Sequence, residues 1–324
     1  MSPAADVREW RLVAQTDLWT GDVDGRGERL IATGLLGSIR WWFEVVVRGL
    51  GGGACDPTTG GGRCPDSGRK PTEPGHHCVA CELFGCTGWA RKFRFEVRDT
   101  DGKVLSQKIT KDKYFLLRFT PLRHIRPEEW ALLDLTLRLI SGYGAMGGKT
   151  VLKPSDDAGR ANPPHHRDYG LVEIKRRPAI EPVPHTQLAP YVRDDRWRRP
   201  PEGEFAWASL SNFWCVNGRY LARESANQST FNRVLGRKES KSLARQLEAA
   251  DAALNAWLAG RQQESKKVFS FKDPPRTFGF VDPGRISFAQ MRQRLEQVWG
   301  TLGPAEFMTG QAILEELVRQ GGGT

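Results

Sequence analysis

The sequence predicts an α+β fold assembled from ferredoxin-like units, and three observations lead to this prediction. Hydrophobic residues make up 39% of the 324 residues, which is enough to build a substantial core. Through residue 177, apolar residues alternate in some segments and recur at helical spacing in others. The resulting order is strand–helix–strand–strand–helix–strand, which is the order of a ferredoxin-like unit with insertions.

The first strand and the first helix are predicted from two apolar patterns. In residues 9–19, one face of an extended chain would carry Trp10, Leu12, Ala14, Thr16 and Leu18. In residues 35–50, the apolar residues are spaced for one side of a helix: Leu35, Ile39, Trp42, Phe43, Val46 and Leu50. The glycine-rich stretch GLGGG then ends the helix, because glycine disfavours helical structure.

The remaining elements of the first half follow the same two periodicities. Residues 89–98 and 113–119 alternate as strands, with the turn sequence DTDGK between them. A second helix is expected to begin at Pro127, because proline fits the first position of a helix, and to end at the glycine-rich GYGAMGGKT. Residues 171–176 complete the unit as a fourth strand.

Domain boundaries are expected in two linkers rich in proline and charge, residues 153–168 and 178–203. We predict a first domain over residues 1–177, with an insertion at about 51–82, and a second, more helical domain over 178–324. The second half shows helix patterns at 240–260, 288–299 and 304–320, and short strand patterns at 205–210 and 276–281. A degenerate second ferredoxin-like unit is compatible with these weakly marked strands.

The chain is basic, with 48 Lys and Arg against 38 Asp and Glu and a formal net charge of +10. This excess favours a polyanionic partner, because each phosphate that a cation neutralises releases condensed counterions. No run of about 18 apolar residues is present to span a membrane. The polar N-terminal sequence MSPAADVREWRLVAQ has no signal-peptide core, so a cytoplasmic location is expected.

Four of the six cysteines fall within 27 residues: Cys55, Cys64, Cys78 and Cys81. Disulfides are disfavoured in a cytoplasmic chain, and four free thiols in a loop would oxidise. A Cys-x-x-Cys pair chelates one tetrahedral ion, and two further thiolates complete its coordination. We therefore predict a structural zinc ion that folds the Gly/Pro-rich insertion, with His76 or His77 as a possible replacement for one thiolate. Four ligands leave no open position for catalysis.

The glycine-rich sequence GYGAMGGKT does not match a phosphate loop. The Walker pattern needs a glycine where Tyr143 stands, and this segment follows a helix instead of a strand. Such a loop can also let the backbone approach a sugar-phosphate chain closely, with Lys149 supplying positive charge. The alternative is a helix end followed by a long turn.

Three stretches of the sequence resemble the RAMP superfamily of CRISPR effector proteins. They are the helix TGLLGSIRWWFEVVVRGL, the cysteine knuckle with the following CELFGCTGWARKFRFEV, and the loop GYGAMGGK. The similarity covers roughly residues 10–150. Within the superfamily, these stretches resemble in particular the first RAMP subunit of the Cmr (type III-B) complex. Cys86 stands where the family turn has serine, and Met146 stands where the family loop often has basic residues.

The resemblance implies a RAMP fold of RRM-like, ferredoxin-like units, usually two in one chain. It implies a non-catalytic subunit that binds guide RNA and target RNA near the guide 3′ end. Such a subunit docks other RAMP subunits of a multisubunit effector complex in antiviral defence, without a membrane. Target slicing and polymerase-type chemistry belong to other subunits of these complexes.

Seven residues are predicted to bind RNA: Arg40, Trp41, Trp89, Arg91, Lys92, Arg94 and Lys149. The Arg40 guanidinium can pair with a phosphate or stack on a base, although it can also bridge to Glu44. Residues 89–94 form an aromatic and basic run that suits backbone neutralisation and base stacking. Trp42 lies on the apolar seam and is expected in the core, so Trp41 is the candidate for an exposed role.

Two other functions fit parts of the sequence. A RAMP endoribonuclease that processes guide-RNA precursors needs positioned acid–base groups, for which His124 and Tyr143 are candidates. An interaction scaffold would use the helical second half to dock a neighbouring subunit, and its RNA contacts would be incidental. Metal-free cleavage of a repeat RNA that is lost in His124→Ala would favour the nuclease.

Overall fold

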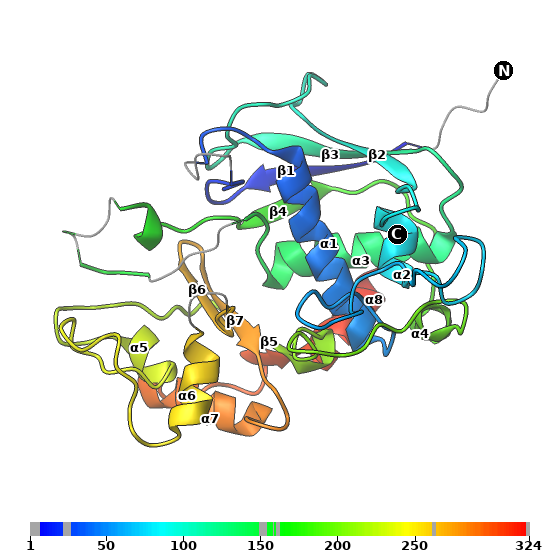
Figure 1. Cartoon of the computed structure of the whole chain (residues 1–324). Helices are drawn as coiled ribbons and strands as arrows, with labels where there is room; N and C mark the ends of the chain where they lie inside the picture. The colour runs from blue at the N-terminus through cyan, green and yellow to red at the C-terminus, as the bar shows by residue number, and fades with distance from the viewer. Residues whose placement is uncertain are drawn as a thin grey trace. The chain divides into compact units, whose positions relative to one another are not determined.

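The computed structural model describes residues 7–21, 27–148, 154–157, 159, 163–260 and 264–321. It contains two four-stranded antiparallel sheets with helices packed on them (Figure 1). The chain divides into two compact units, which comprise Met1–Lys149, Gly170–Ser211 and Gln311–Thr324 in the first, and Thr150–Tyr169 and Asn212–Gly310 in the second. Among the described residues, no helix is both long and apolar enough to cross a bilayer.

The first unit has the predicted ferredoxin-like topology. Its principal elements in chain order are β1 (Arg8–Ala14), α1 (Ala32–Gly49), β2 (Phe93–Arg98), β3 (Tyr114–Pro121), α3 (Pro127–Tyr143) and β4 (Val172–Arg176). The strands lie in the order β2-β3-β1-β4, and every neighbouring pair is antiparallel. Helices α1 and α3 cover one face of this sheet (Figure 1). The insertion between α1 and β2 contains the short helix α2 (Val79–Phe84).

The core of the first unit lies between this sheet and the two helices. The alternating side chains of β1 and β3 that face inward are fully buried, including Trp10, Leu12 and Phe119. The indole nitrogen of Trp10 donates to Asp134 of α3 at 3.0 Å, which joins sheet and helix through one buried hydrogen bond. Trp42 is 3% exposed, so its predicted place in the core is confirmed.

The glycine-rich loop after α3 packs against α1. The indole nitrogen of Trp42 donates to the carbonyl of Ala145 at 2.7 Å, and Ser38 Oγ accepts from the Gly147 amide at 3.0 Å. A Cβ atom at Gly144 would lie 2.7 Å from the Trp42 ring, so only glycine allows this approach. Met146 is fully buried. The described part of this loop therefore serves as a packed helix end.

The second unit repeats the same strand permutation. Its strands are β5 (Phe213–Asn217), β6 (Val268–Lys272), β7 (Pro275–Phe280) and β8 (Phe307–Thr309), in the spatial order β6-β7-β5-β8. Its helices are α5 (Thr230–Val234), α6 (Ala252–Ala259) and α7 (Phe288–Trp299). Helix α8 (Gly310–Gly321) follows the last strand, and from Gln311 onward it belongs to the first unit. The degenerate second ferredoxin-like unit that the sequence allowed is therefore present.

The second half is less helical than predicted. Residues 241–251 do not join α6, because the chain folds back on itself: the amide of Lys238 donates to the Gln246 carbonyl, and the amide of Glu248 donates to the Gly236 carbonyl. Strand β8 replaces the beginning of the helix predicted at 304–320. The strand predicted at 205–210 is a turn segment, and β5 begins only at Phe213. Non-local hydrogen bonds here override local helix preference.

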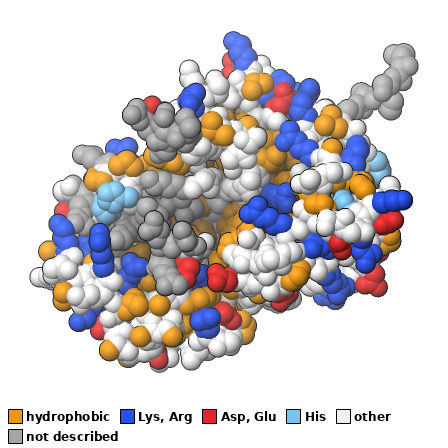
Figure 2. All heavy atoms as spheres, in the orientation of Figure 1, with side chains coloured by type: hydrophobic (Ala, Val, Ile, Leu, Met, Phe, Trp, Pro, Cys, Tyr) orange, Lys and Arg blue, Asp and Glu red, His pale blue; other side chains and the backbone are white. Residues whose placement is uncertain are grey.

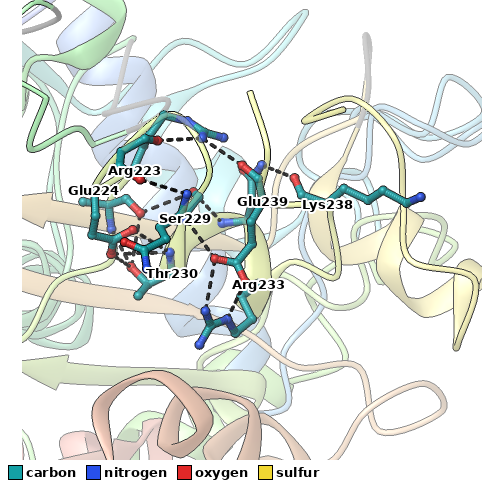
Figure 3. A network of polar contacts seen from close by, with 11 residues as sticks. Arg223, Glu224, Ser229, Thr230, Arg233, Lys238 and Glu239 are labelled. Carbon is teal, nitrogen blue, oxygen red and sulfur yellow. Dashed lines mark hydrogen bonds and ion pairs between the residues drawn. The ribbon is translucent and has the colours of Figure 1, made fainter. Parts of the chain in front are cut away.

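A polar network organises the loop that precedes α6 in the second unit (Figure 3). Arg223 is 7% exposed and donates to the backbone carbonyl of Glu239 at 2.8 Å. The Glu239 carboxylate accepts from the Ser229 amide at 2.9 Å and from Arg233 Nε at 2.7 Å. Charged hydrogen bonds therefore hold a segment that is too polar to build its own apolar core.

Residues 178–211 belong to the first unit, whereas the sequence placed the start of a second domain at residue 178. This segment contains α4 (His185–Arg193), whose Tyr191 hydroxyl donates to Glu129 of α3 at 3.1 Å. Further along, the amide of Arg198 donates to the carbonyl of His77 in the cysteine insertion at 2.9 Å. The proline-rich composition indicated a linker, but these contacts make the segment part of the first unit.

Phe119 should be essential for the stability of the first unit. Its ring makes edge contacts with Trp10 and Phe93 in the centre of the core. The Phe119→Ala variant should lose roughly 3 to 5 kcal/mol of unfolding free energy because it leaves a cavity. Leu122→Ala is the matched control, since Leu122 is 63% exposed. Urea unfolding followed by tryptophan fluorescence measures both; equal midpoints for the two variants would contradict the described core.

Candidate metal centre and nucleic-acid interface

The four clustered cysteines form a candidate metal centre. The sulfur atoms of Cys55, Cys64, Cys78 and Cys81 all lie within 4.8 Å of one another. Cys55 Sγ lies 3.5 Å from Cys81 Sγ and 3.9 Å from Cys78 Sγ. A tetrahedron of thiolates at about 2.3 Å from an ion has edges of about 3.8 Å. The spacing therefore fits one four-coordinate ion, as the sequence predicted.

Backbone amides donate hydrogen bonds to two of these sulfurs, and hydrogen bonds among the thiols lower the pKa of one cysteine while they raise the pKa of the other three. The amide of Cys64 donates to Cys55 Sγ at 3.3 Å, and the amide of Cys78 donates to Cys64 Sγ at 3.2 Å. Hydrogen bonds from neighbouring thiols, that of Cys64 first, hold the pKa of Cys55 well below its usual value. Cys78 caps α2 and Cys81 lies in its first turn, so one short helix presents two ligands to the ion.

The adjacent histidines are not ligands in this arrangement. His76 Nδ1 and His77 Nδ1 share a hydrogen bond of 2.8 Å, and His77 Nε2 contacts a carboxylate oxygen of Glu82 at 2.7 Å. The metal-competent group within the described residues consists of the four cysteines alone. This geometry favours four cysteine ligands over the mixed cysteine–histidine set that the sequence left open.

Arg40 contacts the cluster directly. From α1, its guanidinium donates to Cys81 Sγ at 3.0 Å and to the carbonyl of Gly85 at 2.9 Å, while its Nε donates to Glu44 at 2.9 Å. Burial alone would lower the pKa of Arg40, but the negative charges of Cys81 and Glu44 outweigh it and raise that pKa. Arg40 was predicted to bind RNA. Its guanidinium instead offsets the charge of the thiolates.

The backbone geometry of the turn Leu83–Trp89 requires a glycine at its third position, Gly85. Its φ angle is 85°, in the left-handed region, and a Cβ atom would lie 2.8 Å from the Arg91 amide nitrogen. The turn closes as Cys86 and Trp89 exchange backbone hydrogen bonds of 2.9 and 3.0 Å. Since the Gly85 carbonyl accepts from Arg40, the helix and the turn that carry the resemblance noted in the sequence meet at one hydrogen bond.

Lys92 is buried, which corrects its predicted contact with RNA. It is 5% exposed, and its ammonium lies 2.7 Å from Glu129 and 2.5 Å from Glu82. Burial would raise the pKa of Glu82, but the hydrogen bonds from His77 and Lys92 outweigh burial and lower it to about 2. An ammonium that is enclosed by two carboxylates has no access to a phosphate, and removal of Lys92 would leave two carboxylates without their cation.

Trp89 is engaged by its own unit. Its ring stacks on His77 with 4.5 Å between centroids, and the Arg123 guanidinium lies 4.3 Å from its ring centroid. Its indole nitrogen donates to the Glu82 carbonyl at 3.2 Å. The stacking surface that was predicted for an RNA base is therefore used to hold the turn beside the cysteine knuckle.

The other predicted RNA contacts are more accessible. Trp41 is half-buried and packs edge-on against Trp42, Arg91 is half-buried, and Arg94 is exposed on β2 near Glu96. Lys149 lies outside the described residues. The roles of Trp41, Arg91 and Arg94 in RNA binding stay predictions. Sequence reasoning missed His77, Glu82 and Glu129 as structural partners, because no short-range pattern links them.

Comparison with known proteins gives a family and two solved structures. Residues 11–152 match the family model "RAMPs: RAMP superfamily", which confirms the family resemblance over that segment. Cmr1 from Pyrococcus furiosus in its apo form aligns over 97% of this chain and 96% of its own, at 10% identity and a TM-score of 0.38.

A second solved structure covers less of the chain. The Csm3–Csm4 subcomplex of the type III-A CRISPR–Cas interference complex aligns over 53% of this chain and 75% of that chain, at 15% identity and a TM-score of 0.27. Curated proteins show no significant sequence match to this chain.

The metal content of the purified chain should fall when a cysteine of the cluster is replaced, but not when a cysteine outside the cluster is replaced. We expect about one ion per purified chain, because four thiolates complete one tetrahedral site. The Cys81→Ala variant should lose that ion, whereas Cys215→Ala should keep it, since Cys215 is buried in β5 and outside the cluster. Elemental analysis of the dialysed proteins measures this. A folded wild-type chain without metal would contradict the assignment.

Proposed function

We propose that this chain, which carries a RAMP superfamily domain over residues 11–152, is a non-catalytic RNA-binding subunit of a type III-B (Cmr) CRISPR effector complex. In this proposal it acts in the cytoplasm in antiviral defence, contacts guide or target RNA near the guide 3′ end, and docks neighbouring RAMP subunits. The observation that carries the proposal is the family match together with the β2-β3-β1-β4 sheet of the matched unit.

The charge distribution supports binding to a nucleic-acid backbone. The chain has a formal net charge of +10. Figure 2 shows Lys and Arg side chains spread over the visible face, with Asp and Glu among them, instead of one segregated patch. A surface of this kind favours salt-dependent contacts with phosphates over recognition of particular bases.

The burial of one of the two candidate acid–base residues supports a non-catalytic role. Tyr143 is 6% exposed at the end of α3, so it has little surface with which to reach an RNA substrate. His124 is exposed and follows β3. Of the two proposed groups, only His124 is therefore accessible, and a general acid or base must lie within hydrogen-bond reach of the proton that it transfers.

We also propose that the ion held by the four cysteines is zinc. Zinc favours four thiolates in a tetrahedron, and it does not cycle between redox states. With all four positions filled by cysteine, its contribution is to folding, since residues 51–82 are rich in glycine and proline and lack a core of their own.

Binding of RNA should be strongly dependent on salt and should leave the RNA intact. The affinity of the full chain for single-stranded RNA should fall with KCl on a log–log slope of about −0.7 per contacted phosphate, with weak dependence on sequence. Fluorescence anisotropy measures the affinity, and a denaturing gel of the same samples shows RNA length. His124→Ala is the matched variant and should change neither result. Salt-independent affinity, or metal-free cleavage of repeat RNA that this variant abolishes, would contradict the proposal.

A further inference from the structure

The first sheet has a second face, which points away from α1 and α3. Because side chains alternate along a strand, the residues between the buried ones face outward. On this outer face, β2 carries Arg94, Glu96 and Arg98, β3 carries Tyr114, Leu116, Arg118 and Thr120, and β1 carries Glu9 and Arg11. We call this surface the outer sheet face.

Strand register places three arginines on one line across the outer sheet face. Arg11 of β1 is paired with Arg176 of β4 on one side and with Leu116 of β3 on the other. Leu116 is paired in turn with Arg98 of β2. The line Arg176–Arg11–Leu116–Arg98 therefore crosses all four strands at right angles to them. Neighbouring strands are about 4.8 Å apart, so these cations are close together.

The arginines of this line differ in their carboxylate partners. Glu96 lies 3.1 Å from Arg98 and 3.6 Å from Arg94, and Glu9 lies 3.9 Å from Arg118. In the part of the chain that the structure describes, Arg11 and Arg176 form no ion pair, and both are exposed. Like charges on paired positions of adjacent strands destabilise a sheet, so an anion placed between them would stabilise it.

A hollow beside these arginines offers room for a nucleotide. It has a volume of about 380 Å³, and its lining includes Arg11, Arg176, Arg177 and Leu116, with Glu9 as the one acidic member. Arg177 is held by Asp134 at 2.9 Å. Tyr114 is 42% exposed, and the Arg11 guanidinium lies 5.0 Å from its ring centroid. Cations with an adjacent aromatic ring are the pairing that binds single-stranded nucleic acid.

We infer that the outer sheet face binds the ribose-phosphate backbone of single-stranded RNA along the line Arg176–Arg11–Arg98, with a base or ribose against Tyr114. This inference rests on the proposed RNA-binding function and assigns it a surface. The contacts described above engage Arg40, Lys92 and Trp89 within the first unit. By contrast, Arg11 and Arg176 are exposed and can reach a phosphate. No base-specific donor set is evident on this line, so recognition is of the backbone.

The double variant Arg11→Gln/Arg176→Gln tests the inference in the full chain. Its affinity for a fluorescein-labelled oligouridine RNA should fall about tenfold at about 100 mM KCl, and the log–log salt slope should become shallower by about 1.4, since two phosphate contacts are lost. Lys241→Gln/Arg245→Gln is the matched control: it removes the same charge from exposed positions in the second unit and should bind like wild type.

Two further readouts separate binding from folding and from the proposed function. The Arg11→Gln/Arg176→Gln protein should unfold at the same urea concentration as wild type or higher, because repulsion between paired cations is removed. Ultraviolet irradiation of the wild-type complex should give a uridine adduct on the peptide that contains Tyr114. If wild type binds RNA but this double variant matches its control, the inference falls and the proposed function stands. If wild type binds no RNA, both fall.

Discussion

The first unit depends on one interaction, the insertion of the Arg40 guanidinium between the thiolate cluster and the carbonyl of Gly85. Four thiolates around a divalent ion carry a net charge of about −2, and such charge is costly to bury without a cation beside it. Arg40 supplies that cation from α1. The same side chain thereby fastens the first helix to the cysteine knuckle and to the turn that follows it, 41 and 45 residues further along the chain.

A second layer of buried charge extends this connection toward the rest of the unit. His77 contacts Glu82, Glu82 and Glu129 enclose Lys92, and the Tyr191 hydroxyl donates to Glu129. The chain of contacts runs from the knuckle through β2 to α3 and α4. Several basic and aromatic side chains thus make contacts inside the first unit. The number of cations that can bind a polyanion is therefore smaller than the net charge suggests. Exposed cations that form no ion pair within the described residues, such as Arg11 and Arg176, are therefore the ones that we propose for RNA binding.

Much of the first unit was predictable, because its signals are local. Alternation at Trp10 and Leu12 predicts β1, helical spacing from Leu35 to Leu50 predicts α1, and the cysteine spacing predicts the metal centre. The functions of Arg40 and Lys92 were not predictable, since a sequence shows a charge but not the distant group that neutralises it. The helix predicted at 240–260 was wrong over its first half for the same reason: backbone partners at Gly236 and Lys238 decide the conformation there.

Hydrogen exchange of the full chain with and without the ion that we propose for the four cysteines tests the central claim most directly. Removal of the ion by a chelator should accelerate amide exchange in residues 51–92 and in the turns of α1 around Arg40, because the thiolates then no longer hold the guanidinium. The strands β5 to β8 should exchange as before, since their hydrogen bonds lie in the second unit. Unchanged exchange around Arg40 after verified loss of the metal would contradict the account.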